Sequence, residues 1–147
     1  MKPTHHAIIS AGVGTAFGFW AQSLAAGGVC FLSGIFIDID HVIDYVIFRK
    51  KFPDSYQDLY DFGYKEDKAK LFLFFHSYEL FLLLWILVFC VKMEPIWLGF
   101  AVGLTGHMIC DQFVNPVRPL GYFLFFRLKQ NFERRKILTD AFYKKYS

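Results

Sequence analysis

The stretch at residues 29–48, VCFLSGIFIDIDHVIDYVIF, places four ionisable side chains inside an apolar run. These are Asp38, Asp40, His41 and Asp44, and most of their neighbours are Ile, Val, Phe and Tyr. A carboxylate that is buried without a partner is strongly destabilising or is forced to become neutral. Three carboxylates within seven residues therefore predict a shared partner that compensates their charge.

The rest of the chain surrounds this stretch with further apolar blocks. Hydrophobic residues make up 55% of the 147 residues, compared with about 45–50% in soluble domains. The excess falls in residues 7–24, 25–48, 71–91 and 95–114, and each block is near the roughly 20 residues that a helix needs to cross a bilayer. None of the blocks alternates as a strand would. The sequence predicts an all-α fold, an integral membrane bundle of about four spanning helices.

The basic residues are sorted between the segments that join these blocks. With four crossings, 15 of the 16 Lys and Arg residues fall on the side of the N-terminal stub, the second loop and the tail, and only Lys92 falls on the other. The positive-inside rule makes the richer side the cytoplasm. We therefore expect a multi-pass protein of the cytoplasmic (inner) membrane, with both termini in the cytoplasm and the lipid bilayer as its partner.

The sequence divides into a membrane-embedded helical domain at residues 1–116 and a basic, aromatic tail at residues 117–147. The tail mixes Phe, Tyr and Leu with Lys and Arg, which favours a C-terminal amphipathic helix lying on the inner leaflet. A solvated basic tail is the alternative, and specific binding of nucleic acid is not expected. Cys30, Cys90 and Cys110 lie far apart in apolar runs, which indicates reduced thiols and no thiolate metal site.

All five histidines lie in or beside the blocks, together with five acidic residues. The set is His5, His6, Asp38, Asp40, His41, Asp44, His76, Glu79, His107 and Asp111. With four crossings, every member falls toward the cytoplasmic side. Ionisable groups inside a membrane are costly, which makes them functional candidates. The shared depth predicts one site on the cytoplasmic side.

The residue types in this layer indicate a metal. His107 and Asp111 are four residues apart, and so share one face of a helix. Imidazole nitrogens and carboxylate oxygens without a thiolate suit Zn, Mn, Fe or Ni, and a divalent cation would neutralise neighbouring carboxylates. Two-metal centres with such ligands hydrolyse phosphoesters.

Four short motifs occur in a characteristic order: Thr4-His5, Asp38-Ile39-Asp40-His41, His76-Ser77, and Gly106-His107 through Asp111. This ordered set resembles the bacterial and archaeal family of membrane-bound metal-dependent hydrolases, over residues 4–116. The resemblance implies a helical membrane protein with a His/Asp metal centre, distantly related to zinc-dependent phospholipases C and single-strand nucleases. It also implies a set of metal ligands: His5, Asp38 or Asp40, His41, His76, His107 and Asp111.

The expected function is a membrane-bound hydrolase that uses a divalent metal, zinc or alternatively manganese. It would cleave a phosphoester, such as a lipid headgroup, at the cytoplasmic interface. Asp40 is expected among the ligands, and Asp38 or Asp44 is expected as the general base. A non-enzymatic protein that binds or transports a metal ion or a proton, and a structural metal site, remain alternatives. The outer halves of the blocks are almost bare of polar residues, which favours chemistry at the interface over transport.

Overall fold

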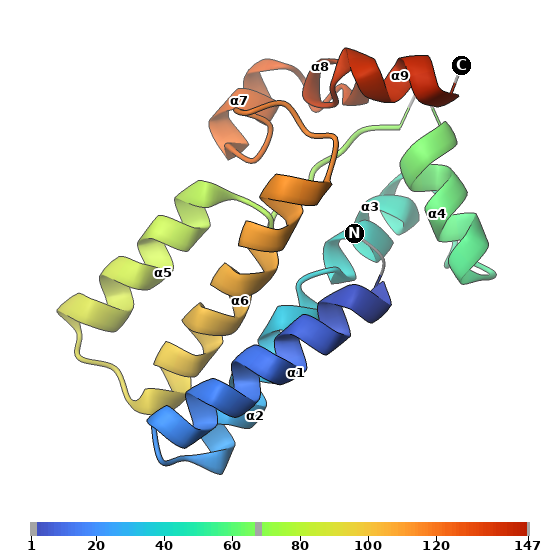
Figure 1. Cartoon of the computed structure of the whole chain (residues 1–147). Helices are drawn as coiled ribbons and strands as arrows, with labels where there is room; N and C mark the ends of the chain where they lie inside the picture. Colours follow the sequence, from blue (N-terminus) through green and yellow to red (C-terminus); the bar gives the residue numbers. More distant parts are fainter. Residues whose placement is uncertain (1–2, 67–68, 147) are drawn as a thin grey trace. The chain divides into compact units, whose positions relative to one another are not determined.

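The computed structural model describes residues 3–66 and 69–146 (Figure 1). Within these residues every regular element is a helix, which confirms the predicted all-α class. The helices are α1 (Pro3–Trp20), α2 (Leu24–Phe36), α3 (Ile39–Arg49), α4 (Tyr56–Lys65), α5 (Tyr78–Cys90), α6 (Pro95–Val114), α7 (Leu124–Lys129), α8 (Arg134–Ile137) and α9 (Asp140–Tyr146). They group into two compact units. The first unit is Met1–Ile37 with Glu79–Asn115, and the second is Asp38–Tyr78 with Pro116–Ser147.

In the first unit, glycines let α1, α2 and α6 pack with their backbones close together. A Cβ atom added at Gly27 of α2 would lie 2.8 Å from the carbonyl oxygen of Gly14 and 2.9 Å from Cα of Gly18, both in α1. A Cβ atom at Gly103 of α6 would collide with the carbonyl oxygen of Cys30 in α2. Only a residue without a side chain fits at these positions, so the glycines set the helix spacing.

Hydrogen bonds between side chains and backbone join the helices of the first unit. The Ser33 hydroxyl donates to the carbonyl oxygen of Phe100 at 3.1 Å, which ties α2 to α6. Trp85 Nε1 donates to Thr105 Oγ1 at 3.1 Å, which ties α5 to α6. These contacts hold α6 in register, and α6 carries two of the predicted site residues.

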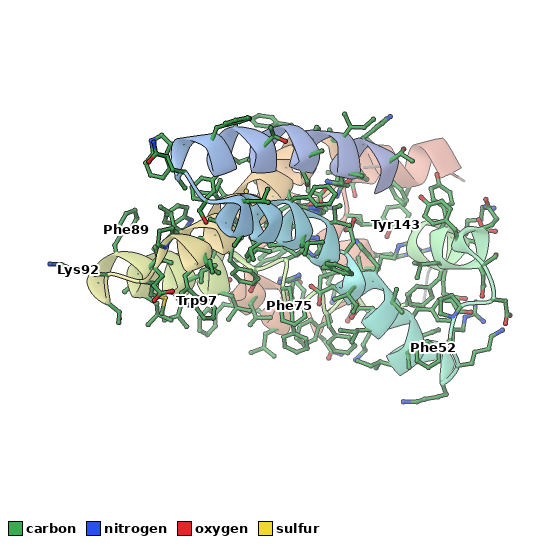
Figure 2. All side chains as sticks on the ribbon, turned by 90° about the horizontal axis from the view of Figure 1, so that it is seen from below. Phe52, Phe75, Phe89, Lys92, Trp97 and Tyr143 are labelled. Carbon is green, nitrogen blue, oxygen red and sulfur yellow. The ribbon has the colours of Figure 1, made fainter. Side chains whose placement is uncertain are left out.

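The helix α5 turns most of its apolar side chains outward. Leu82, Leu83 and Phe89 are 64%, 52% and 69% exposed, and Figure 2 shows Lys92 at the tip of the α5–α6 pair, near Phe89 and Trp97. By length and composition, one helical stretch, Leu24–Arg49 with 26 residues, suits a membrane crossing among the described residues, and α5 is a shorter apolar helix. The four-span arrangement therefore stays a prediction.

The predicted blocks correspond to the helices unequally. Residues 95–114 form α6 as expected, whereas residues 25–48 divide into α2 and α3 at Ile37 and Asp38, where the amide of His41 donates to the carbonyl oxygen of Asp38. The third block was predicted as one helix from residue 71, and this is wrong because α5 begins only at Tyr78. The amides of residues 72, 73, 75 and 76 donate to buried carboxylates, and the amide of His76 also donates to the carbonyl oxygen of Leu73 in a turn.

Two apolar clusters lie among the described residues of the second unit. Tyr45 of α3 packs with Phe62 of α4 and with Ala69, so the second loop contains a helix that the sequence analysis did not predict. The other cluster is made of buried residues before α5 and in the tail: Leu71, Leu73, Ile137, Leu138 and Phe142. The tail thus contributes core residues to this unit.

The single amphipathic helix predicted for the tail is a wrong expectation, because the tail forms three short helices, α7, α8 and α9. Asn131 and Phe132 have left-handed φ angles of 54° and 56°, which end the helical path after α7. Arg127 and Arg134 are almost fully buried, which a helix lying on a membrane surface would not require. The division of the chain at residue 116 stays a prediction.

We predict that Gly103→Ala lowers the free energy of unfolding by about 1–3 kcal/mol, because the new methyl group collides with the backbone of α2. Gly12→Ala is the matched control, since a Cβ atom there meets nothing within 4 Å. The control should raise stability by about 0.5–1 kcal/mol through helix propensity. Denaturant unfolding of the purified protein measures both values, and equal effects of the two substitutions would contradict the packing.

Candidate metal centre

In the first unit, two histidines and one aspartate meet between α1 and α6. His6 Nε2 lies 3.0 Å from Asp111 Oδ1, and His107 Nε2 lies 3.3 Å from Asp111 Oδ2. All three residues are at most 2% exposed. The i to i+4 spacing of His107 and Asp111 puts both on one face of α6, as the sequence predicted.

The other nitrogen of His107 fixes the protonation of its ring. His107 Nδ1 lies 2.7 Å from the carbonyl oxygen of Gly34. A carbonyl oxygen carries no proton, so Nδ1 holds the hydrogen and donates it. In a neutral ring, Nε2 then has a lone pair that faces the carboxylate of Asp111. Two facing lone pairs repel each other, so a positive charge, either a proton or a metal cation, belongs between them.

The His107–Asp111 pair fits a divalent cation. A nitrogen and an oxygen that share a tetrahedral ion at about 2.0–2.2 Å lie roughly 3.3–3.6 Å from each other, and the observed distance is 3.3 Å. The ligand atoms of His107 and Asp111 lie within the 4.8 Å that a shared ion allows. A backbone carbonyl that accepts from the second ring nitrogen is the usual support of a metal-binding histidine. The donor set therefore suits a metal ion.

His6 has a different position in the same cluster. Its ring stacks on that of His107, with centroids 3.8 Å apart and an angle of 11° between the planes. The lone pair of an imidazole lies in the ring plane, and two nearly parallel planes do not meet at one nearby ion. In this geometry His6 Nε2 acts as a hydrogen-bond donor to Asp111, while His107 presents the ligand atom.

The structure brings His6, and not His5, to this cluster. His5 is exposed, whereas His6 is 2% exposed. Consecutive residues of a helix point about 100° apart, so only one of the two can face α6. The assignment of His5 as a ligand stays a prediction that its exposed position does not favour.

In the second unit, His76 forms a separate pair with Asp40. His76 Nδ1 lies 3.1 Å from Asp40 Oδ2, and both residues are at most 2% exposed. The carboxylate accepts the proton of Nδ1, so Nε2 of the neutral ring offers a lone pair. This Nε2 lies 3.7 Å from Asp38 Oδ1, whose side chain is 28% exposed. The ligand atoms of Asp38 and His76 also lie within 4.8 Å of each other.

Backbone amides donate hydrogen bonds to both carboxylates of α3, those of Asp40 and Asp44. Asp40 Oδ2 accepts from the amides of Phe75 and His76 at 2.6 and 3.1 Å. Asp44 Oδ2 accepts from the amides that precede them, those of Phe72 and Leu73. The prediction of Asp40 as a metal ligand and of Asp44 as a general base is not favoured by this placement, because these oxygens already hold the chain before α5.

The remaining candidates lie at the edge of the second group or outside it. His41 has a side chain that is 39% exposed, and its Nε2 is 3.7 Å from Asp38 Oδ1. Its ring centroid is 5.5 Å from that of His76. Glu79 lies in the first turn of α5, in the first unit. His76, which was expected in the first turns of a helix, lies in the non-helical segment before it.

Sequence reasoning missed two groups that position the candidate ligands. The Gly34 carbonyl carries no side-chain signal, so no motif could have shown it. Arg127, which is fully buried and donates to the carbonyl oxygen of His76 at 3.1 Å, was counted only among the basic residues of the tail. A lone arginine in the apolar run YFLFFRL is the signal that could have indicated a buried role.

We predict that Asp40→Asn lowers the free energy of unfolding by about 3 kcal/mol, because the amide places two hydrogens where the site already has N–H donors. Asp38→Asn is the matched control on the same stretch. Its half-buried side chain should change stability by less than about 1 kcal/mol. Thermal unfolding followed by circular dichroism compares the two variants. A change in Asp38→Asn as large as that in Asp40→Asn would contradict the assignment.

The chemistry of this site has to be inferred from its own residues. No family model, curated protein or solved structure matches this chain. The ordered motifs Thr4-His5, Asp38-Ile39-Asp40-His41, His76-Ser77 and Gly106-His107 therefore keep their resemblance to membrane-bound metal-dependent hydrolases as an expectation.

Proposed function

We propose that this protein binds a divalent metal ion through His107 and Asp111 and uses it to hydrolyse a phosphoester at the cytoplasmic face of a membrane. Zinc fits the imidazole and carboxylate donors, and manganese is the second choice. A lipid headgroup is the proposed source of the phosphoester, because it is the phosphoester nearest to a site at that depth. The motif resemblance to membrane-bound hydrolases supports the same reaction class.

One observation carries this proposal: His107 Nε2 faces Asp111 Oδ2 at 3.3 Å inside the first unit. The carbonyl oxygen of Gly34 accepts the hydrogen bond of Nδ1, and the facing lone pairs of Nε2 and Asp111 Oδ2 are compensated by a proton or by a metal cation. Both residues are at most 2% exposed, so water does not screen their repulsion. A divalent ion satisfies the carboxylate and the imidazole together.

Each residue has a definite part in the proposed reaction. A bound divalent ion would supply a water of lowered pKa and stabilise charge on the phosphoryl oxygens. Asp111 and His107 hold the ion, the Gly34 carbonyl fixes the ring of His107, and His6 donates to the second oxygen of Asp111. Asp38 belongs to the second unit, where its carboxylate is partly exposed, and its expected part as a general base stays a prediction from the sequence.

The membrane location is supported by the surface of the helices. The outward residues of α5 are apolar along its length, and the Leu24–Arg49 stretch is long enough to cross a bilayer. The basic residues fall on one side of the predicted crossings. We propose a multi-pass protein of the inner membrane with cytoplasmic termini.

Metal content is the direct test of the proposed centre. Protein purified in detergent without chelators should contain at least one equivalent of zinc or manganese by elemental analysis. His107→Gln and Asp111→Asn should each weaken binding by about 100-fold or more, because each removes a ligand atom. His5→Gln is the matched control and should retain the metal, since His5 is exposed. His76→Gln tests the predicted role of His76 as a metal ligand, which a loss of metal affinity would support.

The same experiment can contradict the proposal. Folded wild-type protein that takes up neither zinc nor manganese would show that a proton supplies the positive charge at His107. His107 and Asp111 would then form a proton-binding pair. The proposed metal-dependent hydrolysis of a phosphoester would be ruled out. Metal binding without cleavage across a panel of phospholipids and soluble phosphoesters would indicate a structural or transport site.

The proposed orientation predicts the side from which two positions can be labelled. In a variant whose three cysteines are replaced by alanine, Glu94→Cys should react with an impermeant maleimide in cells whose outer membrane is permeable. Lys129→Cys, in the tail, should react only after the inner membrane is opened. Both native side chains are exposed. Labelling of Lys129→Cys in sealed cells would contradict the cytoplasmic tail and the span count.

A further inference from the structure

In the second unit, buried charged side chains hold the non-helical segment at residues 71–77. Asp44 accepts from the amides of Phe72 and Leu73 at 2.8 and 3.3 Å. Asp40 accepts from the next pair of amides, which includes that of His76. The two carboxylates thus bind four N–H groups of a segment that lies outside the regular helices.

Arg127 binds the carbonyl groups of the same segment. Its Nη1 donates to the carbonyl oxygen of Leu73 at 2.9 Å, and its Nη2 donates to that of His76 at 3.1 Å. The amide of His76 also donates to the carbonyl oxygen of Leu73 at 3.0 Å, which closes a turn. A guanidinium group is planar and rigid, so two bonds from one arginine fix the separation and direction of both carbonyl groups.

The backbone of this turn needs outside support. Leu73 has a φ angle of 44°, in the left-handed region that a leucine rarely adopts. Such a conformation persists when the surroundings over-determine it. Here the surroundings are Asp44 on the amide of Leu73 and Arg127 on its carbonyl oxygen.

We propose that Arg127 is a positioning residue for His76. By fixing the carbonyl group of His76, it holds the imidazole so that Nδ1 meets Asp40 and Nε2 faces Asp38 Oδ1 at 3.7 Å. The chemical use of Nε2 rests on the proposed function, whereas the positioning itself does not. The tail therefore supplies a part of the second histidine–carboxylate group, 51 residues after His76.

The position of Arg127 is itself well fixed. It lies in α7, where its amide donates to the carbonyl oxygen of Phe123 at 3.1 Å and its carbonyl oxygen accepts from the amide of Phe132 at 2.8 Å. Its side chain is completely buried. Lysine at this position would keep the charge but offer a single flexible ammonium group, so it could not hold the two carbonyl groups in one plane.

The test observes the ring of His76 directly. Full-length protein labelled with ¹⁵N-histidine is compared by NMR as wild type, Arg127→Lys and Arg127→Gln, and the His76 signals are assigned with His76→Gln. Lys129→Gln is the matched control, an exposed basic residue of the same helix. Hydrogen exchange of the segment at residues 71–77 is measured on the same samples, and the His107 signals report the fold of the first unit.

In wild type and Lys129→Gln, the His76 ring should be a single form with hydrogen on Nδ1. In Arg127→Gln it should become a mixture of both tautomers, with amide exchange of His76 about tenfold faster or more. Arg127→Lys should give an intermediate result, and it carries the test if Arg127→Gln does not fold. Folded variants with the wild-type tautomer and exchange rate would overturn the proposal.

These readouts are independent of the proposed function, because neither needs a metal or a substrate. A protein without metal affinity or hydrolytic activity, but with a His76 ring that responds to Arg127, would overturn the hydrolase and keep the positioning role. A metal-binding protein whose His76 ring ignores Arg127 would do the reverse.

Discussion

The need to compensate buried carboxylates is the constraint on which the rest of this structure depends. Asp40, Asp44 and Asp111 are only 1–2% exposed, and a carboxylate in such a place is strongly unfavourable unless hydrogen bonds or positive charge surround it. Each of the three has partners brought from distant parts of the chain. The folding of the chain around these aspartates is therefore also what assembles the candidate site residues.

The two units meet this constraint with different chemistry. In the second unit, backbone amides surround Asp40 and Asp44, and Arg127 adds a positive charge that binds the same segment through its carbonyl groups. Because these amides bind carboxylates, the seven residues at 71–77 before α5 are not helical. In the first unit, Asp111 faces two imidazoles within regular helices. Glycines make that possible, because they bring α1, α2 and α6 close enough for the side chains to meet.

The helices and several candidate site residues could be predicted from the sequence, but the partners of the buried carboxylates could not. Apolar blocks and the absence of alternation predicted helices, and the spacing of His107 and Asp111 predicted their shared face on α6. The predicted start of the third helix at residue 71 was wrong. Hydropathy does not show that the backbone amides there donate to carboxylates and not to helical carbonyl groups. Equally, no pattern shows that the Gly34 carbonyl accepts from His107, since every residue has such a group.

Burial of an acidic residue does not by itself show that the residue takes part in a reaction. The partners of its carboxylate distinguish a structural role from a role in a reaction. A carboxylate oxygen that accepts two backbone amides, such as Asp44 Oδ2, is held by groups that cannot leave without unfolding the segment. An oxygen that faces an imidazole nitrogen, such as Asp111 Oδ2, has a partner whose proton exchanges with a metal ion at little structural cost. By this criterion Asp44 belongs to the fold, and Asp111 belongs to the proposed reaction. Asp40 Oδ2 has both kinds of partner, because it accepts from two amides and also faces His76 Nδ1. In the second unit, Asp38 is half-buried and its carboxylate faces the imidazoles of His41 and His76.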